Sequence, residues 1–373
     1  MALVRLNTRS LPDSAVTTAK VADNAVTTTK LFADNLGRRN LLINGNFDVW
    51  QRATSFTDVA GIWKYGHADR WNGHNDAADA GTYSQSTVVP NAGSNYSMLL
   101  TGASGVSNTN FSQRIESADL KGIREKDSFT VSGYARSAIA GKNIGCHALC
   151  PTATDNYAGY SQHGAVATST TISGNGGTGT SSITLTDANT WYYFTFTKTS
   201  ATSLTNFDKG YALFLAVNGQ NSTSHQVYLS QLQVEAGTTA TPFEQRSFAE
   251  EIHLCKRFYQ KTFNYATAPE NGGGSGVSYN GGLLGYCGSN NNGTLSGFHR
   301  FDPEMRTTPT ITQYGNSSGH WGRLIPTNTG TTSFSAGSGY LGVTKASGVN
   351  FGQNVSGDTL IIGFGHLTAD AEL

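Results

Sequence analysis

The chain has 373 residues, and its 25 basic and 25 acidic side chains cancel. Charged residues make up 13% of the chain, roughly half the usual quarter, whereas 44 residues are glycine. Balanced charge argues against general nucleic-acid binding, which needs uncompensated Lys and Arg, and 39 aromatic side chains (16 Tyr, 18 Phe and 5 Trp) argue against a disordered chain. We expect no membrane insertion and no secretory signal, because residues 1–10 and all later segments lack a long apolar run. The composition favours a β-rich, loop-rich protein with an uncharged surface.

The first 39 residues contain a repeat. Residues 13–22 (DSAVTTAKVA) are followed by the similar unit 23–31 (DNAVTTTKL), and each unit opens with a pair that can cap a helix turn. Helices this short are marginal in water. Each unit contributes to an apolar stripe that consists of Val16, Val21, Val26 and Leu31. Units this short could bury that stripe only against sister copies or a partner. We therefore predict an oligomerising or anchoring repeat over residues 1–39, with a flexible tail as the alternative.

Residues 40–246 have the pattern of a β-sandwich. Three runs rich in β-formers predict strands at 129–135, 191–197 and 211–217. The alternation changes parity between 227–229 and 232–234, which predicts a β-bulge. The start of this region predicts a further strand at 40–43, an Asn-Gly turn and a second alternating run, and the Gly-, Ser- and Thr-rich stretch 169–182 predicts a loop. Short strands without helical periodicity between them predict an antiparallel jelly-roll sandwich.

A linking helix is predicted between two β-rich parts, in the segment 247–261. Ser247 and Glu250 have capping-box spacing, and one face carries Phe248, Ile252, Cys255 and Tyr259. Short β-like segments separated by Asn, Gly and Ser then continue to the end, which predicts a β-rich C-terminal tip domain over 262–373. A domain of that size with so much glycine has a thin core, and burying one face against sister chains would relieve this.

Several motifs resemble parts of bacteriophage tail-fibre proteins. The segments 40–51 (NLLINGNFDVWQ) and 68–71 (ADRW) resemble the opening of a jelly-roll module of such fibres, and 232–244 (LQVEAGTTATPFE) with 254–259 (LCKRFY) resembles its end. The decamer repeat, residues 305–310 (MRTTPT) and residues 368–373 (TADAEL) are also similar to fibre segments. The resemblance implies a fold similar to carbohydrate-binding jelly rolls.

No catalytic motif is recognisable in the sequence, so we expect no enzyme and no cofactor. The carboxylate pairs Glu116 with Asp119 and Asp302 with Glu304 are interpreted as solvated loop charges. The spacing of His67 and His74 is a weak metal signal, and the four cysteines, with His147 between two of them, are interpreted as free thiols. Because jelly rolls of this kind often hold a calcium ion, a structural calcium site is the alternative; its candidate oxygen ligands are Asn75, Asp76 and Asp79.

Aromatic side chains in polar loops are the candidates for carbohydrate binding, because aromatic rings offer contact area at low entropic cost and small polar residues offer hydrogen bonds. Trp50 and Trp71 belong to the fibre-like motif and are predicted to be core residues. The candidate site residues are Trp63, Tyr65, Tyr286, His299, Trp321 and Tyr340.

The sequence therefore predicts a homotrimeric virion tail fibre, assembled in the bacterial cytoplasm, whose residues 1–39 bind other virion proteins. It would attach the virus to host surface polysaccharide or lipopolysaccharide by non-enzymatic, multivalent binding. A structural adaptor or head-decorating fibre without glycan binding is one alternative, and a polysaccharide depolymerase is the other.

Overall fold

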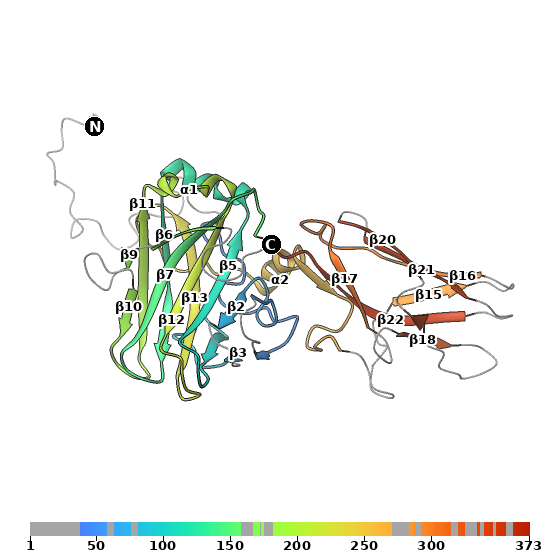
Figure 1. Ribbon diagram of the computed structural model, residues 1–373, viewed down its shortest axis with the longest axis horizontal. Helices are drawn as coiled ribbons and strands as arrows, with labels where there is room; N and C mark the ends of the chain where they lie inside the picture. The colour runs from blue at the N-terminus through green and yellow to red at the C-terminus, as the bar shows by residue number, and fades with distance from the viewer. Residues whose placement is uncertain are drawn as a thin grey trace, which may run out of the picture. The chain divides into compact units, whose positions relative to one another are not determined.

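The structure is a computed structural model. The residues that it describes are 38–57, 63–75, 81–157, 167–171, 173–174, 182–270, 283–287, 293–314, 320–324, 334–335, 339–345, 348–355 and 361–373. The chain divides into two units, Met1–Arg39 and Asn40–Leu373, and the predicted repeat lies almost wholly outside the described residues. The second unit is mainly β with two short α-helices among its described residues, which confirms the predicted fold class (Figure 1).

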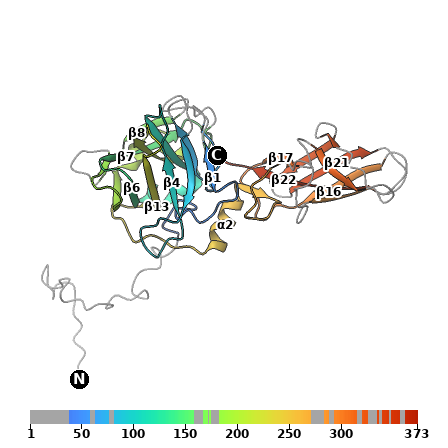
Figure 2. The same cartoon turned by 90° about the horizontal axis from the view of Figure 1, so that it is seen from below.

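Two antiparallel sheets form the sandwich, seen as two layers in Figure 2. The first sheet has the order β1 (Ser55–Thr57), β3 (Thr82–Ser86), β4 (Ser97–Thr101), β13 (Gln226–Ala236), β6 (Ser128–Ser137), β11 (Trp191–Thr199) and β9 (Ser173–Gly174). The second has the order β10 (Ser182–Leu185), β7 (Lys142–Pro151), β12 (Tyr211–Asn218), β5 (Asn108–Ile115) and β2 (Asn72–Asn75), with β8 (Ala167–Thr171) paired to β7.

The main core lies between these sheets. Phe194 and Phe196 of β11 and Leu213 and Leu215 of β12 are all buried in it, two positions apart along each strand as a pleated strand requires. Trp71 stacks on Phe111 with ring centres 4.5 Å apart, and Trp50 is also buried, so the prediction that both tryptophans of the fibre-like motif are core residues is confirmed.

The predicted bulge is present in β13. Its pairing with β6 shifts register between Ser230 and Gln233, and Gln231 has a positive φ of 52°. The bulge keeps Leu229 on one side of it and Leu232 on the other both in the core, which explains the change of parity in the sequence.

Two predictions of local structure were wrong. Residues 40–43 form no strand, because the Asn40 side chain bonds the backbone of Leu42, Leu232 and Val234 and so replaces a strand ladder. The Asn-Gly signal does form a turn, in which the Phe47 N–H donates to the Asn44 carbonyl at 3.1 Å. The stretch 169–182 was predicted as a loop but contains most of β8 and all of β9, since edges of β7 and β11 recruit it.

The linking helix is shorter than predicted. α2 runs over Phe248–Lys256, and the Ser247 side chain caps it by accepting the Glu250 N–H. Tyr259 was predicted on a face of this helix but belongs to β14 (Tyr259–Lys261). Phe248, on the same predicted face, is 49% exposed. The sequence also missed the short helix α1 (Lys121–Lys126).

A third sheet is built around β22 (Ile361–Asp370), which pairs along its length with β18, β15, β17 and β14. The main order of this sheet is β19 (Phe334–Ser335), β18 (His320–Leu324), β22, β15 (Leu283–Cys287), β16 (Gly293–His299), β21 (Gly348–Val355) and β20 (Gly339–Thr344), with β17 (Thr310–Tyr314) and β14 off this path.

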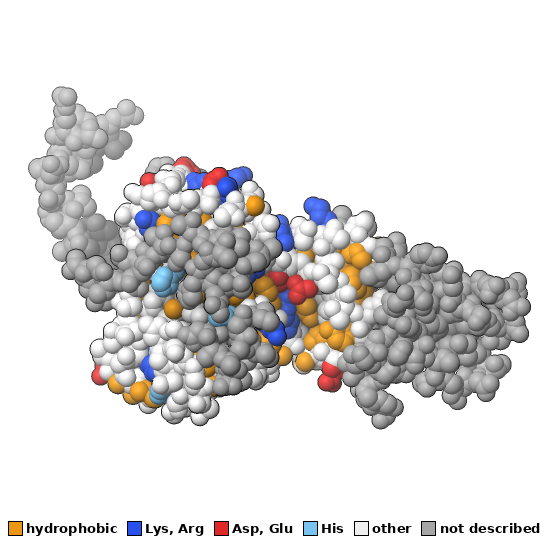
Figure 3. Space-filling model, viewed as in Figure 1, with side chains coloured by type: hydrophobic (Ala, Val, Ile, Leu, Met, Phe, Trp, Pro, Cys, Tyr) orange, Lys and Arg blue, Asp and Glu red, His pale blue; other side chains and the backbone are white. Residues whose placement is uncertain are grey.

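The described surface carries few charged side chains, as the low content of charged residues in the sequence predicts. On the face that Figure 3 shows, most of the described surface is neither charged nor hydrophobic. Among the described residues no helix combines the length and apolarity that crossing a membrane requires.

Cys146, Cys150 and Cys255 are free, buried thiols, as predicted, and burial raises the pKa of Cys150 to about 12.

Candidate functional site

An open groove of about 940 Å³ lies where three distant segments meet. Its lining comes from residues within 46–55, 85–96 and 245–268. We call it the aromatic groove, because Trp50, Tyr96, Phe248 and Tyr265 line it together with Asp48 and several amide side chains. Ring faces for sugar C–H groups, with planar polar groups for hydroxyls, make a surface suited to a saccharide.

One wall is the loop between β3 and β4, and the bulge of β13 holds it. The Gln231 side chain donates to Asn91 Oδ1 and to Ser94 Oγ, both at 2.9 Å. Ser94 in turn donates to Asn46 Oδ1 at 2.7 Å, and Asn46 and Gln245 both donate to the Gly93 carbonyl. The wall is therefore fixed before any ligand binds.

A second wall carries two exposed aromatic rings. Phe248 is 49% and Tyr265 38% exposed, and their rings meet edge to face with centres 5.5 Å apart. The Tyr265 hydroxyl accepts the backbone N–H of Trp50 at 2.8 Å and donates to the backbone carbonyl of Asp48 at 3.3 Å. Burial raises the pKa of Tyr265 to about 12, and the two hydrogen bonds of its hydroxyl hold the ring in place.

The ammonium of Lys261 fixes the segment that carries Tyr265. It donates to the backbone carbonyls of Gln51, Tyr265 and Thr267 at 2.6 to 2.7 Å. Gln51 and Tyr265 both line the groove, so a single side chain ties two distant parts of its lining together.

Asp48 supplies a carboxylate to the groove. Asn46 donates to one of its oxygens at 3.1 Å and Asn95 to the other at 3.3 Å. Burial raises the pKa of Asp48, and the two amide hydrogen bonds oppose that shift. Asp48 forms no salt bridge with any residue that the structure describes.

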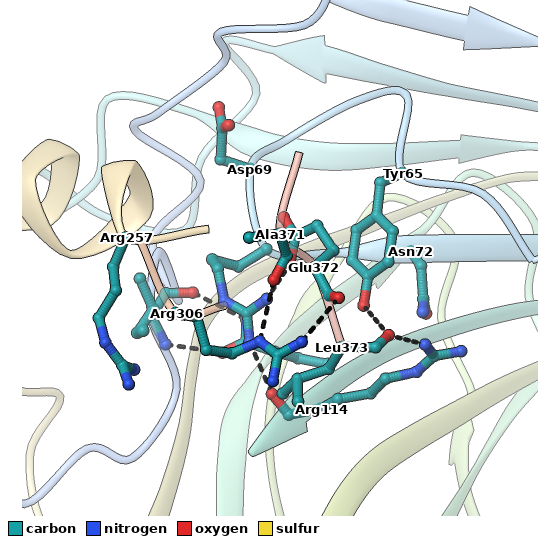
Figure 4. A network of polar contacts seen from close by, with 12 residues as sticks. Tyr65, Asp69, Asn72, Arg114, Arg257, Arg306, Ala371, Glu372 and Leu373 are labelled. Atoms are coloured by element: carbon teal, nitrogen blue, oxygen red, sulfur yellow. Dashed lines mark hydrogen bonds and ion pairs between the residues drawn. The ribbon is translucent and has the colours of Figure 1, made fainter. Parts of the chain in front are cut away.

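Two of the residues predicted from sequence, Trp63 and Tyr65, lie outside the lining of the groove and are half-buried. Trp63 stacks on His74 with ring centres 5.1 Å apart and contacts the ring of Phe214. The Tyr65 hydroxyl donates to the backbone oxygen of Leu373 at 3.5 Å (Figure 4). Both therefore pack within the described structure, and their role in binding stays a prediction.

Tyr65 belongs to a buried polar network around the last residues of the chain (Figure 4). Glu372 forms ion pairs with Arg52 and Arg70, and Arg114 donates to the backbone oxygen of Leu373. The Arg70 guanidinium also lies over the ring of Phe258, at 3.5 Å from its centre. These contacts join the last residues of the chain to Arg52, Arg70 and Arg114 of the sandwich.

The other four predicted residues belong to the third sheet. Tyr286, Trp321 and Tyr340 lie on β15, β18 and β20, and their side chains are outside the described part of the structure. His299 is half-buried, stands edge-on to Phe301 at 5.9 Å, and has a pKa lowered by burial. The sheet spreads these four positions over several strands instead of joining them at one edge.

The remaining polar candidates have ordinary surroundings or lie outside the described residues. Glu116 forms an ion pair with Arg257, and Glu304 forms an exposed one with Lys345 at 3.2 Å. His67 is buried against the ring of Tyr83 in the core, whereas His74 bonds Asn110. The calcium candidates Asp76 and Asp79, and the side chain of Asn75, lie outside the described residues.

The sequence did not reveal the aromatic groove. Asp48 and Asn95 are 47 positions apart, and Trp50 and Tyr265 are 215 apart, so no local spacing joins them. One signal was available: Asp48 lies inside the fibre-like motif 40–51, two positions before Trp50.

No protein-family profile matches the chain, and no curated protein does. Among solved structures, a candidate sugar-binding protein from Bacteroides thetaiotaomicron has 16% identity and a TM-score of 0.32, over 53% of this chain and 100% of that one. A family 11 carbohydrate-binding module from Clostridium thermocellum has 9% identity and a TM-score of 0.28, over 50% and 98%. The enzymatically active domain of tailspike protein 4 from bacteriophage CBA120 has 12% identity and a TM-score of 0.29, over 53% and 21%. TM-scores this low do not establish a shared function.

Proposed function

We propose that the protein binds glycans without cleaving them, and that the aromatic groove is its binding site. The observation that carries this proposal is the exposed pair of Phe248 and Tyr265 beside the amides of Asn46 and Asn95 and the carboxylate of Asp48. A pyranose ring can place its C–H face against the aromatic rings and direct its hydroxyls to the amides and the carboxylate. Fixed walls reduce the entropic cost of binding.

We further propose that this binding attaches a virion to its bacterial host, with the chain as a homotrimeric tail fibre held by residues 1–39. The support is the order of fibre-like motifs along the sequence. Three weak sites on one fibre would act together, since the second and third binding events are intramolecular.

A structural virion adaptor without glycan binding and a polysaccharide depolymerase are the alternatives. Among the described residues that line the groove, Asp48 is the one carboxylate. A two-carboxylate glycosidase mechanism needs a second acid across the sugar, so the groove favours binding over hydrolysis.

A glycan array probed with the full chain and two variants tests the proposal. Phe248→Ala removes an exposed ring from the groove, whereas Phe298→Ala removes a ring that is 55% exposed on β16, outside the groove lining. We expect Phe248→Ala to weaken binding roughly tenfold, the usual effect of losing an aromatic anchor, and Phe298→Ala to bind like the wild type.

The outcomes separate the three functions. Silence on the array and on intact host cells would favour the adaptor, and shortened oligosaccharides after incubation would favour the depolymerase. A molar-mass measurement in solution tests the trimer, and a stable monomer would contradict it.

A further inference from the structure

The cationic side chains that line the aromatic groove are already neutralised by the chain itself. Arg52 pairs with Asp69, Asp370 and Glu372, at 3.1 to 3.3 Å. Arg246 pairs with Glu251 at 3.2 Å and with Glu244 at 3.6 Å. Both arginines are held by carboxylates of their own and are not available to an acidic ligand.

Unlike these two arginines, Asp48 has no oppositely charged partner among the described residues. It is half-buried and receives two neutral amide donors, Asn46 and Asn95. A carboxylate in this position bears a desolvation cost that neutral donors offset only in part, and the raised pKa of Asp48 has the same cause. A cationic ligand group would offset that cost.

Aromatic rings surround the same space. The Tyr265 hydroxyl bonds the Asp48 backbone, and the Tyr265 ring meets Phe248. Tyr96 follows Asn95 directly and lines the groove. Ring faces attract cations through their quadrupole, so the rings and the carboxylate favour the same kind of ligand.

We propose that the aromatic groove selects saccharides with a free, protonated amino group, and that the ammonium pairs with Asp48. This inference rests on the proposed glycan-binding function and names its ligand class. Amino sugars whose nitrogen is acetylated keep the ring and the hydroxyls but lose the charge. Sugars with a carboxylate meet an uncompensated like charge at Asp48 and are disfavoured.

The test is an array of gluco-, galacto- and manno-configured amino sugar oligomers, each printed in free-amine and N-acetylated form. We expect the wild-type chain to prefer at least one free-amine form over its acetylated twin by about tenfold or more, the usual size of a charge-assisted contact. Asp48→Asn should abolish this preference. Asp208→Asn, the same change at an exposed carboxylate outside the groove lining, should keep it.

The comparison within the wild type needs no variant, so it stands even if Asp48→Asn folds poorly. Equal or stronger binding of acetylated forms, sensitive to Phe248→Ala, overturns the amino-sugar inference and leaves glycan binding intact. Free-amine preference that persists in a folded Asp48→Asn protein overturns the role of Asp48. Failure to bind any glycan overturns the proposed function and this inference with it.

Discussion

Arg70 and Glu372 are 302 positions apart in the sequence and form a buried ion pair, with side chains only 2% and 5% exposed. The pair joins the turn before β2 to the residues that follow β22, and Glu372 also pairs with Arg52. Among the described residues, Glu372 is the one carboxylate that pairs with Arg70. The third sheet is therefore anchored to the sandwich by charge as well as by the backbone.

Glu372→Gln should lower the free energy of unfolding by about 3–5 kcal/mol, because it leaves the buried guanidinium of Arg70 uncompensated. Urea denaturation followed by tryptophan fluorescence measures this. Glu304→Gln removes a partner of an ion pair whose side chains are about half exposed, and should change stability by less than about 0.5 kcal/mol. Equal effects of both changes would contradict the prediction.

Gly45→Ala should destabilise the protein by about 1–3 kcal/mol, as overpacking does. A Cβ at position 45 would lie 2.2 Å from the Leu232 carbonyl oxygen, and that oxygen is fixed because Leu232 bonds back to Gly45 in the bulge. Gly122→Ala is the matched change, since a Cβ there meets nothing closer than 3.7 Å and the residue lies in α1. It should stabilise the protein by about 0.5–1 kcal/mol. Thermal unfolding of both variants checks the pair, and a stable Gly45→Ala protein would refute the packing argument.

The sequence predicted those parts of the fold that depend on local alternation. The strands around 129–135, 191–197 and 211–217 and the bulge near 231 were correctly predicted, because each carries its own buried face. Residues 40–43 were misjudged because the Asn40 side chain takes over hydrogen bonds that a strand would make, and apolar alternation does not reveal this. The aromatic groove was missed because only tertiary contacts bring together the three segments that line it.

Lys261→Met should weaken glycan binding by roughly tenfold and cost about 1.5–3 kcal/mol of stability. The change leaves the carbonyls of Gln51, Tyr265 and Thr267 without the ammonium that holds them, so the Tyr265 wall loosens. Array binding and denaturation of the same preparation measure the two effects. Lys345→Met, at a side chain that is 54% exposed, should alter neither; unchanged affinity in Lys261→Met would show that the wall does not depend on this lysine.

His67 makes the stability of the sandwich depend on pH. Its ring stacks on Tyr83 with centres 4.7 Å apart, and neither ring nitrogen has a hydrogen-bond partner among the described residues. Burial, helped by the charge of Arg52, lowers the pKa of His67 from 6.5 to about 3. On acidification the unfolded chain therefore takes up this proton before the folded chain does, and stability is lost as pH falls below 6.5.

His67→Phe should remove that loss. The variant should be about 1 kcal/mol more stable than the wild type at pH 7, because an unsatisfied buried imidazole is replaced by a hydrocarbon ring, and the gap should widen by about 2 kcal/mol by pH 5. Burial also raises the pKa of Asp69 to about 6. Between about pH 4 and pH 6 the Asp69 carboxyl therefore stays protonated in the folded chain but ionises in the unfolded chain, and the stability falls as pH rises through this range. The pH dependence of stability that Asp69 causes is opposite in sign to the one that His67 causes. Asp69 is present in both the wild type and His67→Phe, so the difference in stability between the two proteins reports His67 alone. Urea denaturation at pH 7, 6 and 5 measures the gap, and a gap that stays constant with pH would mean that folding does not lower the pKa of His67.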